Sequence, residues 1–245
     1  MIGRIQSIQS LGTLDGPGVR FVAFMAGCPL RCKCCHNPET IDGKDFGKYE
    51  PEKLADTAAR FLEYFGERGG VTLSGGEPLL QAEFATEYFR LCHERGINTC
   101  LDTSGITFSR EPKMLEKFNT LLGVTDLVML DIKHTDDRGH VQLCGKEGTA
   151  PRDLLRYLSE IGKPTRIRYV LVPGYTDGED DLLRLGEIVR SVASLESLEI
   201  LPYHELGKVK YEALGMPYKL EGVRVPSAED IARAKDIINK NAPQA

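Results

Sequence analysis

Apolar and polar residues along the chain follow two periods in turn, one typical of short buried strands and the other of amphipathic helices. β-Branched and aromatic runs predict strands, and apolar residues three and four apart predict the helices between them. The predicted strands are 19–25, 70–74, 98–102, 126–131, 166–172 and 197–202. The predicted helices are 52–67, one that turns Phe84, Tyr88, Leu91 and Cys92 inward, 111–122, 152–161, 179–192 and 227–240.

Two helices carry further signals. The helix over 52–67 is expected to bury an apolar face, and the last helix has the layout of an N-cap at Ser227 followed by first-turn acids. Gly96 stands where a glycine commonly ends a helix. The face that we expect to be buried in 52–67 consists of Leu54, Ala58, Phe61, Leu62 and Phe65.

Strands that alternate with helices predict an α/β fold with a parallel sheet, because each parallel pairing needs a crossover. A partial barrel and an open doubly wound sheet share this order of elements. In both folds ligands bind at the carboxyl edge of the sheet. The unusual residue clusters all follow predicted strands, at 28–36, 74–77, 102–105, 131–133, 172–174 and 202–207.

Composition narrows the classes of function. The 245 residues carry a formal net charge of -5, which argues against a surface that tracks nucleic-acid phosphates. No apolar run is long enough to span a bilayer, and the first residues lack the layout of a secretion signal. We therefore expect a cytoplasmic protein that binds neither nucleic acid nor membrane. Four of the seven cysteines lie between 28 and 35, which indicates metal binding in a reducing compartment.

One segment, Gly-Cys-Pro-Leu-Arg-Cys-Lys-Cys-Cys-His-Asn-Pro, places Cys28, Cys32 and Cys35 in a C-x3-C-x2-C spacing. Three thiolates with no fourth at matching distance leave one iron of a four-iron cluster open, whereas ordinary iron-sulfur and structural zinc sites fill every position. An open iron can bind a cofactor or substrate. A zinc site with His36 as the fourth ligand is the alternative, although adjacent Cys35 and His36 make tetrahedral geometry awkward.

This spacing and the His-Asn-Pro after it resemble the radical S-adenosylmethionine enzymes, and among them the activating enzymes of glycyl radical proteins. The resemblance covers Gly12 to Leu220 and implies a partial (β/α)6 TIM-like barrel in a single domain over 1–245, with a core over about 12–205 and a C-terminal helix over about 227–240. It implies an oxidoreductase whose reduced 4Fe-4S cluster cleaves S-adenosylmethionine to methionine and a 5′-deoxyadenosyl radical, which takes hydrogen from a glycine of the partner. The implied partner is pyruvate formate-lyase, the implied electron donor is flavodoxin-like, and we expect a monomer.

The resemblance also implies the contacts of S-adenosylmethionine. Gly-Gly-Glu-Pro matches the family segment that binds the cofactor's amino group, although a Gly-Gly turn alone is also typical of a strand-to-helix connection. Asp-Ile-Lys matches the family's Asp-Leu-Lys, and a histidine in Pro-Tyr-His-Glu-Leu-Gly lies beside the adenosine. The family usually has an aromatic residue where this chain has Cys34, so backbone groups are expected to carry more of the adenine contact. The expected contacts are Cys34, Cys35, His36, Gly75, Gly76, Glu77, Asp131, Ile132, Lys133, Arg168 and His204.

Oxygen atoms at strand ends suit a hard cation, although such carboxylates can also cap the helix that follows. By resemblance we expect a monovalent-cation site made of Asp102, Thr103, the backbone of Met129, and Asp131. Arg168 lies in a strand that reads as buried, so its charge should reach a carboxylate or the cofactor.

The segment Asp-Gly-Pro-Gly-Val-Arg over 15–20 has the residues of a turn before the first strand. In the family it is part of the surface that accepts the target loop. The resemblance therefore implies that Asp15, Gly16, Gly18 and Arg20 bind the partner.

Two other functions remain open. A small-molecule radical enzyme, such as one that makes a deazapurine, would share the cysteines and the Gly-Gly-Glu turn but would need a closed substrate pocket. A non-catalytic zinc or electron-transfer protein would need only the cysteines, and bound zinc without iron would favour it.

Overall fold

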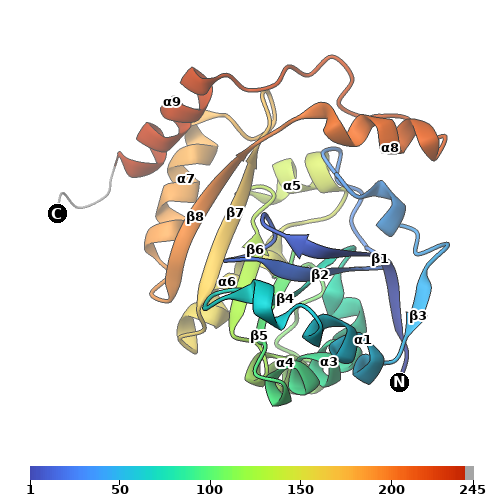
Figure 1. The fold of residues 1–245 in the computed structure, drawn as a ribbon. Helices are drawn as coiled ribbons and strands as arrows, with labels where there is room; N and C mark the ends of the chain where they lie inside the picture. The colour runs from blue at the N-terminus through green and yellow to red at the C-terminus, as the bar shows by residue number, and fades with distance from the viewer. Residues whose placement is uncertain (241–245) are drawn as a thin grey trace. The chain divides into compact units, whose positions relative to one another are not determined.

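The computed structural model describes residues 1–240, and contacts divide the chain into two compact units. The first unit comprises Met1–Pro29 and Glu39–Met129, and the second comprises Leu30–Pro38 and the described chain from Leu130 onward. The strands form one sheet in the order β3-β1-β2-β4-β5-β6-β7-β8 (Figure 1). The six strands expected from the sequence are consecutive in this order, and the sheet is open, with β3 and β8 at its ends.

Parallel strands in the first unit bring their carboxyl ends to one edge. The central strand β4 (Gly70–Gly75) pairs in parallel with β2 (Arg20–Met25) and with β5 (Asn98–Thr103). Met25 lies opposite Gly75, and Leu73 lies opposite Leu101. Within the first unit, the residues just after these strands therefore come together, which is what the sequence predicts for 74–77, 102–105 and the start of the cysteine cluster at 28–29.

Helices cover the sheet of the first unit and complete its core. Figure 1 shows α1, α3 and α4 side by side, and contacts join α1 to α3 and α3 to α4. The inward residues Phe84, Tyr88, Leu91 and Cys92 are buried, as predicted. The helices are α1 (Pro51–Ala59), α2 (Leu62–Phe65), α3 (Ala82–Glu94) and α4 (Pro112–Gly123), and the 3-10 helices are η1 (Pro38–Thr40), which begins in the second unit, and η2 (Pro78–Gln81).

The prediction of one continuous helix over 52–67 is wrong, because the segment forms two helices. The first helix ends at Ala59, and a turn at Arg60 and Phe61 separates it from α2. This turn places the Phe61 ring 5.7 Å from that of Phe21, a contact that supports the core at the cost of helical continuity. Leu62 is exposed as a result, although we expected it to be buried.

Two strands at one end of the sheet were not predicted. β1 (Gly3–Gly12) pairs antiparallel with β2, and β3 (Gly47–Tyr49) pairs antiparallel with β1. The isoleucines of β1 stand three residues apart, at Ile5 and Ile8, instead of alternating. A register shift between Ile5 and Ser7 absorbs the extra residue, so the strand has no clean two-residue period for the sequence to show.

The second unit pairs β7 (Thr165–Leu171) in parallel with β8 (Leu195–Pro202). β6 (Leu127–Asp131) ends in this unit. The helix α9 (Ala228–Asn239) begins with a capping box formed by Ser227 and Asp230, as its sequence predicts. The remaining helices are α5 (Asp137–Cys144), α6 (Thr149–Glu160), α7 (Glu179–Arg190) and α8 (Lys208–Ala213), with the 3-10 helix η3 (Glu205–Gly207).

The helix α5 was also not predicted, because Gly139 lies inside it and glycine disfavours helices. A Cβ at this position would lie 2.0 Å from the His134 ring, so packing requires the glycine. Asp136 offsets part of the cost, since its side chain accepts a hydrogen bond from the Gly139 amide at 2.7 Å.

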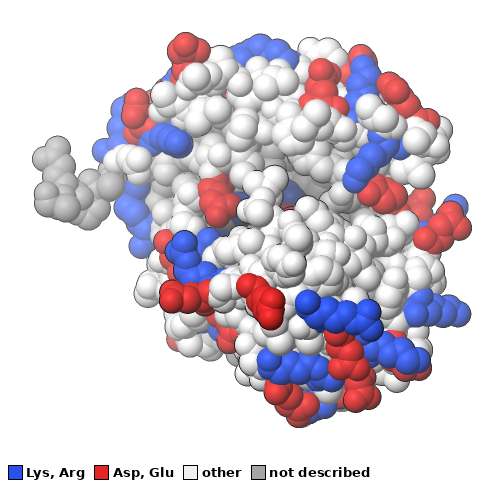
Figure 2. Space-filling model, viewed as in Figure 1, with Lys and Arg blue, Asp and Glu red and all other residues white. Residues whose placement is uncertain are grey.

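No helix among residues 1–240 is long and apolar enough to cross a membrane. On the face drawn in Figure 2, basic and acidic side chains are interspersed and no broad basic area is seen. The expected single domain over 1–245 stays a prediction.

The most heavily bonded side chain of the first unit is the fully buried Arg20 at the start of β2. Its guanidinium donates to Thr72 Oγ1 at 2.8 Å and to the Val71 carbonyl at 2.6 Å. A planar fork of donors can satisfy several acceptors that would otherwise be buried without partners. Its other acceptors are the carbonyls of Pro17, Arg68 and Asn98 and the Asn98 side chain.

Replacing Arg20 with Met should lower the free energy of unfolding by about 3 kcal/mol, because the buried carbonyls lose their donor. Urea unfolding followed by circular dichroism measures the change. Lys53→Met is the control, since Lys53 forms an exposed ion pair with Glu50 and should change little. A loss below about 1 kcal/mol in Arg20→Met would contradict this role.

Candidate functional site

The cysteine loop starts in the first unit, directly after β2. The Gly27 amide donates to the Thr40 carbonyl at 2.7 Å, and the Cys28 amide donates to the Ile41 carbonyl at 3.0 Å. These bonds tie the start of the loop to the segment that follows it in the chain. Backbone contacts therefore fix the position of Cys28.

The rest of the loop belongs to the second unit. The amides of Arg31 and Lys33 donate to the carbonyls of Cys144 and Leu143, each at 2.9 Å. A turn then brings the Cys35 amide to the Cys32 carbonyl at 3.3 Å. Cys32 thus lies between two anchored neighbours, and Cys35 follows on a tight turn.

The donor set fits an iron-sulfur cluster better than a single zinc ion. Cys28, Cys32 and Cys35 are half-buried and form no disulfide, which suits three sulfur ligands of a cluster. In the described chain, the one group of three ligand atoms within 4.8 Å of one another is His134, Asp136 and Asp181. Neither the three cysteines nor Cys32, Cys35 and His36 are gathered as closely as the ligands of a single ion.

The intervening thiol of Cys34 differs from its neighbours because it is buried. Burial raises the pKa of Cys34 to about 12. A neutral buried thiol packs as a small apolar group, so the position that is usually aromatic in the family is filled here without a ring.

The Gly-Gly-Glu turn packs its backbone on the start of the cysteine loop. The Gly76 amide donates to the Met25 carbonyl at 2.9 Å, and the Glu77 amide donates to the Gly27 carbonyl at 2.8 Å. A Cβ on Gly76 would lie 2.2 Å from the Gly27 oxygen, and Gly75 has a φ of +97°. Both glycines are therefore required by the fold, whether or not a cofactor is bound.

The Glu77 carboxylate points into the first unit and is fully buried. It accepts hydrogen bonds from the Leu79 amide at 3.1 Å and from the Ser104 amide at 3.0 Å, and also from the hydroxyls of Thr103 and Ser104. Burial raises the pKa of Glu77, while the hydrogen bonds from Ser104 and Thr103 act in the opposite direction. The side chain thus holds the ends of β4 and β5 together, and its predicted cofactor role becomes one of positioning.

The predicted cation ligands of the first unit are engaged with protein groups. Asp102 accepts a hydrogen bond from the Ser74 hydroxyl, and the Thr103 hydroxyl donates to Glu77. Met129 is buried against Cys100 and Leu127. Asp102 does not serve as a helix cap, because it lies within β5, and it remains a candidate ligand beside the Gly-Gly-Glu turn.

In the second unit the Asp131 carboxylate already faces two positive charges. Lys133 Nζ donates to Asp131 Oδ2 at 2.8 Å, and Arg168 Nε lies 3.3 Å from Oδ1. Burial works against ionisation, but the charges of Arg168 and Lys133 prevail and lower the pKa of Asp131. Arg168 therefore reaches a carboxylate, as expected for a charge in a buried strand. The arrangement disfavours a further cation on Asp131.

His36 and His204 form a flat pair in the second unit. Their ring centroids lie 4.1 Å apart with an angle of 8° between the planes. His36 Nε2 lies 3.3 Å from the His204 carbonyl, and Gly207 packs on Cys35 and His36 so closely that a Cβ there would lie 3.4 Å from the Cys35 oxygen. Burial and the neighbouring His204 lower the pKa of His36, which favours the uncharged ring. The flat, uncharged ring of His36 is a suitable surface for a purine base.

The predicted partner-binding loop needs one correction. Arg20 is fully buried and bonded inside the first unit, so it cannot contact a partner protein. It holds the loop instead, together with the Thr72 hydroxyl, which donates to the Asp15 carbonyl at 2.7 Å. Leu14, which the sequence did not single out, is 85% exposed beside Asp15.

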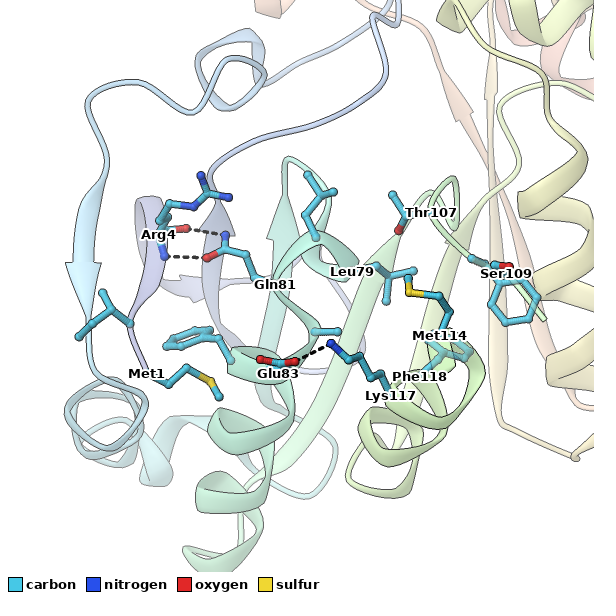
Figure 3. A pocket seen from close by; sticks show the side chains of 15 residues that line it. Met1, Arg4, Leu79, Gln81, Glu83, Thr107, Ser109, Met114, Lys117 and Phe118 are labelled. Atoms are coloured by element: carbon cyan, nitrogen blue, oxygen red, sulfur yellow. Dashed lines mark hydrogen bonds and ion pairs between the residues drawn. The ribbon is translucent and has the colours of Figure 1, made fainter. Parts of the chain in front are cut away.

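An apolar pocket of about 440 Å³ in the first unit is separate from these residues. Figure 3 shows Gln81 bonded to the backbone of Arg4, and Lys117 bonded to Glu83. None of the predicted site residues lines it. A well-formed apolar hollow is often taken as the site of a protein, and here that rule would point away from the cysteines.

Sequence reasoning missed several residues of the site. Ser74 and Ser104 lie in clusters that follow strands, so a polar residue at the end of a buried strand was the available signal. Cys144 gave no signal, because only folding brings it to the cysteine loop.

The radical SAM superfamily matches residues 22–186 of the chain. The pyruvate formate-lyase-activating enzyme of Streptococcus mutans is 45% identical over 239 residues, which cover 97% of this chain and 91% of that protein. The pyruvate formate-lyase 1-activating enzyme of Escherichia coli is 45% identical over 243 residues, which cover 98% of this chain and 96% of that protein.

Solved structures agree in fold. A domain of a pyruvate-formate lyase-activating enzyme from Bacteroides vulgatus matches with a TM-score of 0.57 and 25% identity, over 70% of this chain and 94% of that one. Coproporphyrinogen III oxidase of Escherichia coli, a radical SAM enzyme, matches with a TM-score of 0.55 and 14% identity, over 89% of this chain and 51% of that one. The chain therefore belongs to the radical SAM superfamily and, within it, to the family of pyruvate formate-lyase-activating enzymes.

Proposed function

We propose that the chain activates pyruvate formate-lyase by generating a glycyl radical on it. The observation that carries this proposal is the anchored loop of Cys28, Cys32 and Cys35, in a chain 45% identical to activating enzymes over nearly its whole length. The three thiolates would hold a 4Fe-4S cluster with one open iron. When bound, the reduced cluster supplies the electron that cleaves S-adenosylmethionine, and the 5′-deoxyadenosyl radical so formed takes hydrogen from the partner's glycine.

The chain's own residues bind and orient the cofactor. In the first unit, the backbone of Gly75 and Gly76 would receive the amino group, with Glu77 holding that backbone in place. In the second unit, Lys133 and Arg168 supply buried positive charge for a carboxylate, and Asp131 balances it.

The adenine would rest on the flat surface of His36 and His204. Backbone groups of Cys34 and Cys35, which directly precede His36, and of Ile132 would complete the contact. Asp102 and Thr103 would contribute oxygen to a monovalent cation or directly to the cofactor. We retain Met129 and Asp131 as weaker candidates for that cation, since the first is buried in apolar surroundings and the second faces Arg168 and Lys133.

The partner would dock on the loop around Asp15, Gly16 and Gly18, with Leu14 as an apolar contact. A flavodoxin-like protein is the electron donor that we propose, acting on a monomer of this chain. The cytoplasm is the compartment that we propose, because the cysteines of the described chain form no disulfide.

Replacing Cys28, Cys32 or Cys35 with Ala should abolish formation of 5′-deoxyadenosine from S-adenosylmethionine by the anaerobically reconstituted, reduced protein. Each change removes one of the three ligands and should also lower the iron bound per chain. Chromatography of the product and iron analysis measure both effects. Cys92→Ala is the matched control, since Cys92 is buried in α3 and should leave most of the activity. Full activity without any one of the three thiols would refute the assignment.

Asp102→Asn should raise the Kd of S-adenosylmethionine about tenfold, because a charge-assisted contact beside the Gly-Gly-Glu turn is lost. Equilibrium binding to the reconstituted protein measures the change, and added potassium should not restore affinity. Asp126→Asn is the control, since Asp126 bonds the Thr99 amide at 2.8 Å at the start of β5 and should leave the Kd unchanged. An unaltered Kd in Asp102→Asn would remove the cation or cofactor role.

Leu14→Asp should raise the KM for pyruvate formate-lyase about tenfold, because a charge replaces an exposed apolar contact. Formation of 5′-deoxyadenosine without the partner should stay at the level of the unaltered protein. Tyr64→Asp changes another exposed apolar side chain of the first unit, at 60% exposure, and serves as the control. Equal KM values for both variants would place the docking surface elsewhere.

A further inference from the structure

Cys144 lies at the C-terminal end of α5, against the middle of the cysteine loop. The residues on both sides of Cys32 bond to this helix end, Arg31 to the Cys144 carbonyl and Lys33 to the Leu143 carbonyl, each at 2.9 Å. The backbone of the loop at Cys32 is thus separated from the end of α5 by the length of one hydrogen bond. Such a separation is in the range over which disulfides join two segments.

The side chains of the two cysteines also meet. Cys144 is fully buried and Cys32 is half-buried. A hydrogen bond joins the Cys32 and Cys144 thiols. The radical chemistry gives Cys144 no task, because three thiols already complete the expected ligand set.

Both thiols are free in the described chain, and so is that of Cys34. Cys34 is in the same loop, but it is separated from Cys32 by a single residue, and it has no backbone bonds that hold it opposite Cys32. Cys35 is engaged in the turn that begins at Cys32. Cys144 is therefore the cysteine best placed to react with Cys32.

We propose that Cys32 and Cys144 form an oxidisable pair, which closes to a disulfide when no cluster occupies Cys32. A low-molecular-weight disulfide is the oxidant. Cys32, the less buried of the two cysteines, loses its proton, attacks the disulfide and releases one thiol. Cys144 then loses its proton, attacks the Cys32 sulfur and releases the second thiol. Two protein thiols are oxidised, one external disulfide is reduced to two thiols, and the two protons pass to those products.

The consequence rests on the proposed function, in which Cys32 is a cluster ligand. The disulfide would remove that ligand, so the apoprotein could not take up iron and sulfide until the bond is reduced. The apoprotein would thereby have an oxidised, protected state, and a thiol reductant would restore its ability to take up iron and sulfide. The bond would also close a long loop between residues 32 and 144, which constrains the unfolded chain.

The test begins with the anaerobically purified apoprotein. It is treated with oxidised glutathione, the remaining thiols are blocked with N-ethylmaleimide, and the proteolytic peptides are mapped by mass spectrometry. We expect a cross-linked peptide pair containing Cys32 and Cys144, which disappears after dithiothreitol. A blocked Cys144 in a protein that carries glutathione on Cys32, or a dominant cross-link of Cys32 to Cys28, Cys34 or Cys35, would overturn the proposal.

Iron uptake supplies the second measurement. After the same oxidation, the unaltered protein should lose uptake of iron and sulfide without carrying glutathione on Cys32, and should regain uptake with dithiothreitol. Cys144→Ala should instead retain glutathione on Cys32, because no second thiol is present to displace it. Cys92→Ala is the matched control and should behave as the unaltered protein. If Cys144→Ala folds poorly, Cys144→Ser replaces it, and the peptide map of the unaltered protein does not depend on either variant.

The two measurements separate the two claims. A Cys32–Cys144 cross-link in a protein that takes up no iron even when reduced would support the pair and defeat the proposed function. Normal iron uptake by the reduced protein, with no such cross-link after oxidation, would support the function and defeat the pair.

Discussion

The buried carboxylate of Glu77 is the constraint on which the first unit of the site depends. It joins the end of β4 to the end of β5 through Thr103 and Ser104, while its own amide is bonded to Gly27 at the start of the cysteine loop. An ionised group without solvent is costly unless hydrogen bonds replace the water. Its set of donors meets that need, so the ends of three strands are held in one arrangement.

In the second unit, a buried carboxylate is stabilised by positively charged side chains instead of by neutral hydrogen-bond donors. Asp131 lies with Lys133 and Arg168 where water is largely excluded, and removal of one partner would leave an uncompensated buried charge. Such a group specifies geometry more than it adds stability. It gives the family's Asp-Leu-Lys position in this chain a physical reason, since the lysine and the aspartate fix one another before any cofactor binds.

The spacing of apolar residues predicted most elements. Buried strands and amphipathic helices have clear patterns of this kind, as at β2, β4, β5 and α3. The prediction failed where packing overrode the pattern. A bulge interrupts the alternation of apolar residues in β1, and a turn at Phe61 divides a predicted helix. In α5, the glycine that packs against His134 weakens the helical pattern of the sequence. These causes lie in contacts between distant residues and leave no local signal.

In the site, too, some features were visible in the sequence and others depend on contacts between distant residues. The cysteine spacing and the polar clusters after strands were visible in the sequence, since their order along the chain is the order of the strands. The burial of Arg20 was not visible, because a turn sequence gives no sign of the carbonyls that gather around its arginine. Likewise, the proximity of Cys144 to Cys32 depends on where α5 ends.

Hydrogen transfer from the partner's glycine is the central claim, and isotope transfer tests it most directly. Pyruvate formate-lyase carrying glycine deuterated at the α-carbon is mixed with the reduced, reconstituted protein and S-adenosylmethionine. We predict a glycyl radical in the electron paramagnetic resonance spectrum and deuterium in the 5′-deoxyadenosine, in equal amounts. Formation of 5′-deoxyadenosine without deuterium and without a radical on the partner would contradict the account.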